Sequence, residues 1–239
     1  MKNVRASVAM AVYNGEKYLP QQIDSILSML SEDDELVISY DESTDSTPEI
    51  IRRYETAHPN VHCVKNVEKP GVSGNFTSAA RNCRGKYIFF SDQDDIWMGD
   101  KINTMIKALE KNNADLAVHD GYLTDANLVR LPQTLFEINR SCTGPVRNFI
   151  KGRFLGCCMA FKAETMSYVL PFPDVTSDFP HDIFATIMVG LKGRIVMVPE
   201  CFIMHRLHEG NATPKKRNSL LKIAANRMIL LGQIIKRSI

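Results

Sequence analysis

The feature that most constrains the fold of this chain is the alternation of short apolar runs with helix-like segments in its first half. Strands are predicted at residues 7–12, 36–38, 61–64, 87–90 and 116–118, and helices at 19–30, 76–83 and 101–111. Thr47 is the expected N-cap of a further helix, because Pro48 suits the first helical position. Repeated strand–helix–strand order predicts an α/β fold with a mostly parallel central sheet flanked by helices.

Acidic residues follow two of these predicted strands. Asp41 comes after 36–38, and Asp92, Asp94 and Asp95 come directly after 87–90. Ligands of parallel sheets bind outside the carboxyl ends of the strands. Three carboxylates within four residues repel one another unless a cation neutralises them, and Mg²⁺ and Mn²⁺ prefer carboxylate oxygens. The pattern predicts a site for a divalent cation and a diphosphate, with a solvated acidic turn as the alternative.

The second half is less regular. Residues 121–147 are polar and predicted to be rich in loops, 154–161 a strand and 163–170 a short helix. A helical apolar face follows His181 and Asp182, and residues 194–198 and 201–204 are predicted to form a pair of strands.

Other classes of protein are disfavoured by motifs and composition. The sequence contains neither G-x-G-x-x-G nor G-x-x-x-x-G-K-[ST], so the glycine-rich phosphate loops are absent. Its six cysteines lack zinc spacing, and its N-terminal apolar run is too short for a signal peptide, so we expect reduced thiols and a cytoplasmic protein. The net charge of +2 conceals a basic end, because residues 210–239 hold seven basic and no acidic residues.

Five segments together resemble family 2 glycosyltransferases. Residues 6–19 resemble the opening strand and turn of that family, and Tyr40-Asp41-Glu42-Ser43-Thr44-Asp45 resembles its D-D-G-S-T-D turn. Residues 85–97, with Asp92-Gln93-Asp94, resemble the D-x-D region. His181-Asp182 and residues 205–211 are similar to late motifs of the branch with bacterial rhamnosyltransferases and surface-polysaccharide hexosyltransferases. The resemblance runs from residue 4 to about residue 213.

The resemblance implies a GT-A fold, with a Rossmann-like nucleotide-sugar half at about 1–120 and an acceptor half at about 121–213. It also implies inverting transfer of a hexose or deoxyhexose from UDP-hexose or dTDP-rhamnose to a hydroxyl of a growing surface polysaccharide. The acceptor is a glycan or a lipid-linked glycan. Residues 214–239 form a predicted basic amphipathic helix, for which contact with an anionic membrane and packing on the catalytic body are both open. We expect no nucleic-acid partner.

Site roles follow from the same resemblance, position by position. The implied nucleotide-sugar residues are Ala11, Tyr13, Glu16, Asp41, Asn75 and Asp92, and the implied ligands of Mn²⁺ or Mg²⁺ are Asp92, Asp94 and His208. Asp182 matches the catalytic base and, at a helix N-terminus, is expected to stay ionised. Three residues keep alternatives. Trp97 stacks on an acceptor sugar or packs under the acidic loop, and Asn75 contacts the nucleotide or caps its helix. His208 binds the metal, or lies at the surface or beside the ligands without binding it.

Two departures and two other functions complete the prediction. Tyr40 and Glu42 stand where the family has Asp and Gly, and a positive φ at Glu42 would be strained. The alternatives are a sugar-1-phosphate nucleotidyltransferase and a non-catalytic glycan- or membrane-binding scaffold. The first needs a basic, glycine-rich loop after the first strand, which Tyr13-Asn14-Gly15-Glu16 does not supply. Intact Asp92, Asp94 and Asp182 argue against the second.

Overall fold

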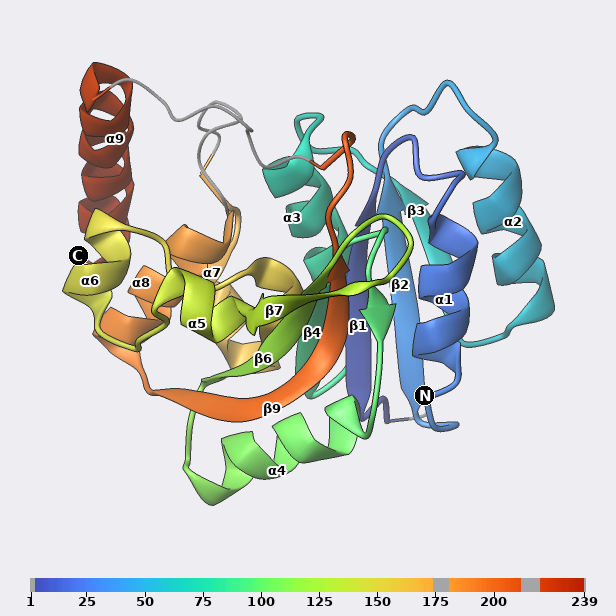
Figure 1. The fold of residues 1–239 in the computed structure, drawn as a ribbon, viewed down its shortest axis with the longest axis horizontal. Helices are drawn as coiled ribbons and strands as arrows, with labels where there is room; N and C mark the ends of the chain where they lie inside the picture. The colour runs from blue at the N-terminus through green and yellow to red at the C-terminus, as the bar shows by residue number, and fades with distance from the viewer. Residues whose placement is uncertain (1–2, 174–180, 212–219, 239) are drawn as a thin grey trace.

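The computed structural model describes residues 3–173, 181–211 and 220–238 and shows one mixed sheet with helices around it (Figure 1). Its first four strands are β1 Ala6–Val12, β2 Asp34–Tyr40, β3 Val61–Lys65 and β4 Tyr87–Ser91. They run parallel in the order β3-β2-β1-β4, which confirms the parallel sheet predicted for the first half.

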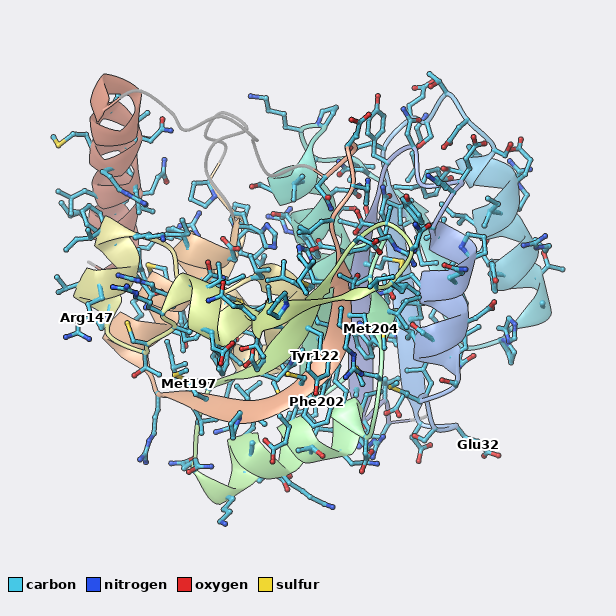
Figure 2. The ribbon with its side chains drawn as sticks, viewed as in Figure 1. Glu32, Tyr122, Arg147, Met197, Phe202 and Met204 are labelled. Carbon is cyan, nitrogen blue, oxygen red and sulfur yellow. The ribbon has the colours of Figure 1, made fainter. Side chains whose placement is uncertain are left out.

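Strands of the second half extend this sheet beyond β4. They are β5 Ile96–Trp97, β6 Leu116–Thr124, β7 Arg130–Thr134, β8 Met159–Lys162 and β9 Ile195–Arg206. β8 joins β4 to β6 by antiparallel pairing on both sides, and β9 runs parallel to β6. β9 bends around the lower part of the molecule, with Phe202 and Met204 close to Tyr122 of β6 (Figure 2). The described sheet is therefore parallel from β3 to β4 and mixed beyond β4.

Helices pack around the sheet, and several of them lie together beyond it at one side of the molecule (Figure 1). They are α1 Leu19–Leu27, α2 Thr47–Ala57, α3 Val72–Asn82, α4 Lys101–Lys111, α5 Leu135–Asn139, α6 Pro145–Ile150, α7 Met166–Val169, α8 His181–Lys192 and α9 Leu220–Ser238, with single 3₁₀ turns at Gly156–Cys158 and Ala163–Thr165. Among the described residues, none of these helices is long and apolar enough to cross a membrane.

Several sequence predictions of local structure are wrong. Residues 194–204 form the single strand β9 because a bulge opposite β6 accommodates Pro199: His119 pairs with Val198, whereas Asp120 pairs with Cys201. Residues 121–147 include β7, α5 and the start of α6, and only the end of 154–161 is strand. Thr47 is the first residue of α2 rather than its N-cap, and its hydroxyl instead accepts a hydrogen bond from the Gly15 N–H at 2.7 Å.

A buried polar cluster joins β1, β2 and the approach to β4 at the amino end of the sheet. Glu35, which is 2% exposed, accepts hydrogen bonds from the Ser7 hydroxyl at 2.6 Å and from the Arg84 guanidinium at 2.6 Å. The Gly85 N–H donates to the Ser7 hydroxyl at 2.8 Å. Gly85 therefore lies directly against the backbone of β1, and a larger side chain does not fit at this position.

We predict that Gly85→Ala destabilises the fold. A Cβ at this position would lie 2.6 Å from the Ser7 nitrogen and 2.7 Å from the Ala6 carbonyl carbon, and neither backbone atom can rotate away. Overpacking of this kind costs about 2 kcal/mol, measured as the free energy of unfolding in urea. Gly232→Ala is the matched control, because nothing lies within 4 Å of the added methyl and alanine favours the interior of α9. Equal stability of the two variants would contradict the prediction.

Candidate active site

The carboxyl ends of β1, β2 and β4 meet at one edge of the sheet, and the acidic positions of the sequence follow them there. The Val12 carbonyl accepts hydrogen bonds from the Asp41 N–H at 3.0 Å and from the Asn75 side-chain amide at 2.9 Å. Asn75 lies inside α3 and is 2% exposed, so the prediction that it caps its helix is wrong. Its amide instead ties α3 to the end of β1.

The predicted nucleoside residues Asp41 and Glu16 are both engaged by backbone groups. Asp41 is 9% exposed, and its carboxylate accepts from the Asn66 amide at 2.7 Å and the Gly71 N–H at 2.8 Å. The Glu16 carboxylate accepts from the Ser46 N–H at 3.0 Å, at the start of α2. Both carboxylates therefore shape the loops around the edge of the sheet.

Two other features of this edge concern Ala11, Tyr13 and Glu42. Ala11 is partly buried on β1, and the Tyr13 side chain is 53% exposed. Glu42 is absent from the non-glycine residues with positive φ in the described chain, so its replacement of glycine strains nothing. The turn after β2 therefore keeps Asp41 without the backbone freedom of a glycine.

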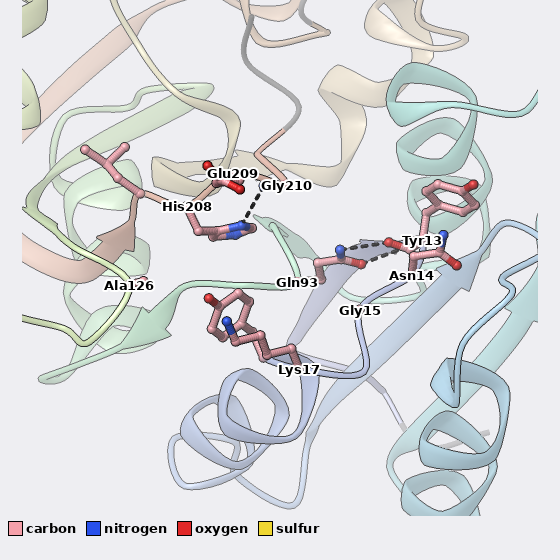
Figure 3. A pocket seen from close by; sticks show the side chains of 11 residues that line it. Tyr13, Asn14, Gly15, Lys17, Gln93, Ala126, His208, Glu209 and Gly210 are labelled. Carbon is pink, nitrogen blue, oxygen red and sulfur yellow. Dashed lines mark hydrogen bonds between the residues drawn. The ribbon is translucent and has the colours of Figure 1, made fainter. Parts of the chain in front are cut away.

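Gln93, the middle residue of the D-x-D segment, binds the loop after β1. Its side-chain oxygen accepts from the Tyr13 N–H at 2.8 Å, and its side-chain nitrogen donates to the Tyr13 carbonyl at 2.9 Å (Figure 3). A Cβ at Gly15 would lie 2.8 Å from the Gln93 oxygen, so glycine makes room for this pairing. The acidic loop and the loop carrying Tyr13 consequently form one unit, a link that the sequence did not signal.

A cleft of about 710 Å³ opens beside this unit (Figure 3). Its lining residues come from the loop after β1, from Gln93, and from the ends of β6 and β9: Tyr13, Asn14, Gly15, Lys17, Tyr18, Gln93, Ala126, Leu207, His208, Glu209 and Gly210. Of the predicted site residues, Tyr13 and His208 line it. Asp41, Asp92, Asp94 and Asp182 are not among the lining residues. Lys17 adds a cation to the cleft that the sequence analysis missed.

The acidic loop carries more negative charge than its surroundings neutralise. Burial, followed by the charges of Asp95 and Asp94, raises the pKa of Asp92. Burial and the charge of Asp95 likewise raise the pKa of Asp94, although the hydrogen bond from His208 opposes this. Burial alone would raise the pKa of Asp95 too, but His205 lowers it. Two of the three carboxylates are thus destabilised as anions, and a bound cation would relieve both.

A buried ion pair supports the loop from the end of β9. The His205 Nδ1 lies 2.9 Å from an Asp95 carboxylate oxygen, and Asp95 is fully buried. Burial would lower the pKa of His205, but the Asp95 charge and hydrogen bond raise it to about 10, so the ring is an imidazolium. The next residue, Arg206, donates to the Asp94 carbonyl at 3.0 Å.

His208 reaches the same loop, as the sequence predicted for a residue of the late motif. Its Nε2 lies 2.7 Å from an Asp94 carboxylate oxygen. Its ring packs at 4.6 Å on the ring of Tyr18, and the Arg206 guanidinium lies 4.4 Å from that same Tyr18 ring. Residues 114 positions apart are therefore brought together by contacts that fix the imidazole plane.

The predicted metal ligands have a donor set that suits Mn²⁺ or Mg²⁺. Asp94 and His208 are in contact, and Asp92 lies two residues away in the same strained cluster of charge. A second group, Asp95, Cys157 and His205, is the set of three donors that lie within 4.8 Å of one another in the described chain. That group already contains the His205–Asp95 ion pair. The donor atoms of Asp92, Asp94 and His208 do not all lie within 4.8 Å of one another, so the structure brings Asp94 and His208 together but not the complete predicted set. In chemistry, the three residues still match the oxygen and nitrogen ligands of such a cation.

Asp182 lies in the first turn of α8, as predicted, and is 6% exposed. The Ile183 N–H donates to its carboxylate at 2.6 Å. Burial nevertheless raises the pKa of Asp182 to about 7, so the helix N-terminus does not compensate for lost water as we expected from the sequence. Such a carboxyl group can exchange a proton near neutral pH.

His181 is a buried neutral ring beside Asp182. It stacks on Phe76 at 4.2 Å, and burial lowers its pKa to about 3. Neither ring nitrogen has a hydrogen-bond partner among the described residues. The aromatic stacking gives His181 a packing role.

The 3₁₀ turn Gly156–Cys158 connects Asp182 to the acidic loop. The Gly156 backbone interacts with Asp182 and lowers its pKa against the effect of burial, while the neighbouring Cys157 sulfur lies within 4.8 Å of donor atoms of Asp95 and His205. A Cβ at Gly156 would lie 2.3 Å from the His181 Nε2, so glycine is required for this approach. This connection could not be predicted from the sequence, because these residues lie inside an apolar run.

Trp97 lies in the core, which corrects its suggested role in acceptor binding. Its side chain is 2% exposed, the Lys101 ammonium lies 3.6 Å from its ring centroid, and Phe89 packs at 6.1 Å. A sugar cannot reach a ring covered in this way. Trp97 therefore packs beneath the acidic loop.

Comparison with curated proteins finds relatives among bacterial glycosyltransferases. The chain is 34% identical to the dTDP-rhamnosyl transferase RfbG of Shigella flexneri over 168 residues, which cover 66% of this chain and 55% of that protein. It is 24% identical to the UDP-Glc:alpha-D-GlcNAc-diphosphoundecaprenol beta-1,3-glucosyltransferase WfaP of Escherichia coli, covering 90% of this chain and 82% of the relative. The chain thus spans about half the length of RfbG.

Solved structures share the fold at low sequence identity. S. aureus TarS 1–349 in complex with UDP-GlcNAc superposes with a TM-score of 0.75 at 18% identity, covering 99% of this chain and 68% of that one. The mannosyltransferase PcManGT from Pyrobaculum calidifontis, in complex with GDP-Man and Mn²⁺, gives 0.67 at 21% identity, covering 97% and 64%. The fold is that of the GT-A glycosyltransferases. Residues 7–168 match the sequence model of the family described as Glycosyl transferase family 2, and the chain belongs to that family.

Proposed function

We propose that this chain is an inverting, metal-dependent glycosyltransferase that transfers a hexose or deoxyhexose from UDP-hexose or dTDP-rhamnose to a hydroxyl of a growing cell-surface polysaccharide. The observation that carries the proposal is the link, through Gly156 and Cys157, between the acidic loop and Asp182 in a chain of family 2. The names of RfbG and WfaP support a rhamnosyl or glucosyl donor. The name of WfaP also supports an acceptor carried on a lipid diphosphate.

The donor half of the mechanism is assigned to the carboxyl edge of the sheet. Tyr13 and Asp41 contact the nucleoside, with Ala11, Glu16 and Asn75 shaping the pocket. Asp92, Asp94 and His208 would hold Mn²⁺ or Mg²⁺, which supplies Lewis-acid stabilisation of the departing diphosphate. Lys17 lines the same cleft and adds positive charge for the phosphates.

The acceptor half depends on Asp182. Inversion is a single displacement at the anomeric carbon, through an oxocarbenium-like transition state, while a base removes the proton of the acceptor hydroxyl. A general base works best when its pKa lies near the working pH, and burial places that of Asp182 at about 7. No cofactor chemistry is needed for this proton transfer.

Asp182→Asn tests the base. The amide keeps the shape of the side chain and can still accept from the Ile183 N–H, but it cannot take a proton. We expect kcat for transfer to fall roughly 10²- to 10⁴-fold, while donor affinity stays unchanged. Both are measured with the donor that a screen of UDP-, dTDP- and GDP-sugars identifies. Asp100→Asn, at the start of α4, is the control and should transfer at the wild-type rate. Wild-type transfer by Asp182→Asn would overturn the mechanism, whereas absence of transfer by the wild-type chain with every donor would leave the non-catalytic scaffold.

The pH dependence of transfer tests the same group independently. The active form of Asp182 is the carboxylate, and its pKa is raised to about 7. Below that pH the group is protonated, so kcat/KM should fall about tenfold for each unit of decreasing pH and reach a plateau above it. A pH profile measured at saturating metal checks this. A flat profile across pH 5–9 would show that no group with a pKa in this range controls transfer, and would contradict the role of Asp182.

His208→Ala tests the metal ligands. Removing one of three ligands should weaken Mn²⁺ binding in the presence of UDP roughly tenfold or more, measured by electron paramagnetic resonance of free Mn²⁺. His58→Ala is the matched control, because that imidazole stacks on Tyr54 and is not among the residues that line the cleft. Mn²⁺ affinity within about twofold of wild type would remove His208 from the ligand set.

A further inference from the structure

Exposed apolar side chains gather where α6 and α9 lie side by side (Figure 1). Val146 and Ile150 of α6 are 70% and 68% exposed, and Met228, Leu231 and Ile235 of α9 are 70%, 40% and 49% exposed. We call these five side chains the α6–α9 surface. Exposed apolar patches of this kind mark sites of protein or membrane contact.

The two helices form one surface because α9 is fixed on the body. Leu230 is fully buried and Ile234 is 7% exposed, so one face of α9 packs against the protein. The Arg227 guanidinium donates to the Ile150 carbonyl at 3.4 Å, which places that side of α9 against α6. Leu231 and Ile235 follow Arg227 at intervals of four residues, so they continue the same side of the helix. The outer stripe of α9 thus borders the exposed tips of α6.

The sequence stretches that contain and flank these two helices carry charge of one sign. The sequence stretches 140–153 and 214–239, which contain α6 and α9, hold eleven basic residues and no acidic residue. The basic residues are Arg140, Arg147, Lys151, Arg153, Lys215, Lys216, Arg217, Lys222, Arg227, Lys236 and Arg237. Arg147 follows Val146 on α6 and extends away from the body (Figure 2). The partner that complements this surface is therefore apolar beneath a layer of negative charge.

We propose that the α6–α9 surface docks on a bilayer containing anionic lipid, with the apolar side chains in the interface and the basic side chains among the headgroups. A second copy of the chain fits less well, because a twofold interface would place like-charged surfaces against each other. The proposal differs from docking by the basic C-terminal segment alone, since α6 contributes the most exposed apolar pair.

The position of the surface has a functional meaning that rests on the proposed transfer reaction. Both α6 and α9 pack on α8, the helix that carries Asp182 in its first turn. Docking through these helices holds the segment with the base near the bilayer, where a lipid-linked acceptor would lie. The partner is identified by the surface itself, so it can be tested without donor or acceptor.

The experiment measures sedimentation of the full chain with phosphatidylcholine vesicles containing about one third phosphatidylglycerol, and with phosphatidylcholine alone. We expect wild type to bind the anionic vesicles and to dissociate as salt screens the charges. The double variant Val146→Ser/Ile150→Ser should lower the partition coefficient roughly tenfold, with Met228→Ser/Ile235→Ser giving a similar loss. Val67→Ser is the control, because Val67 is 89% exposed in the segment between β3 and α3.

Thermal midpoints equal to wild type establish that each variant is folded. The proposal is overturned if wild type stays in the supernatant, or if both double variants bind as tightly as wild type. It is also overturned if sedimentation velocity shows a dimer that Val146→Ser/Ile150→Ser dissociates while lipid binding is absent, because the occupant would then be a second copy. Failure here leaves transfer by Asp182 untouched, and failure of the Asp182→Asn test leaves vesicle binding untouched.

Discussion

The buried ion pair between His205 and Asp95 is the interaction on which the site depends. It joins the last strand of the described sheet to the loop that follows β4, across 110 residues of sequence. Without it, three neighbouring carboxylates would face one another in a poorly solvated place. With it, one carboxylate is held as an anion, and the remaining charge of Asp92 and Asp94 is left for a cation. Arg206 and His208, on either side in the chain, then reach the same loop.

The two halves of the chain position the site by different means. In the first half of the chain, parallel strands of fixed register bring Tyr13, Asp41 and Asp92 to one edge of the sheet. The Val12 carbonyl accepts hydrogen bonds from Asp41 and Asn75, which hold the segment after β2 and helix α3 against the end of β1. In the acceptor half, Asp182 stands on a helix, and a single 3₁₀ turn connects it to the acidic loop. Burial rather than charge pairing sets the acidity of Asp182.

The limits of sequence interpretation follow this division. Apolar periodicity predicted the first-half elements because each is local, and strand ends revealed Asp41 and Asp92. Two strands were predicted on either side of Pro199, and proline has no N–H to donate to a neighbouring strand. The structure has one strand, because a bulge opposite β6 leaves Pro199 out of the pairing. Trp97 follows the acidic loop, which suggested a role in acceptor binding, and burial excludes that role. Asn75 precedes a predicted helix, which suggested a capping role, but α3 begins earlier, at Val72. Gly156 had no signature, because its importance comes from the distant ring of His181.

The double hydrogen bond of Gln93 changes how the D-x-D segment of this chain is to be interpreted. Here an amide accepts from and donates to one residue of the neighbouring loop, and a carboxylate could only accept. The segment therefore provides negative charge at its two outer positions. At its centre it provides a side chain that joins the acidic loop to the loop carrying Tyr13. We expect relatives in which the same two loops are joined to carry an amide side chain, asparagine or glutamine, at this position.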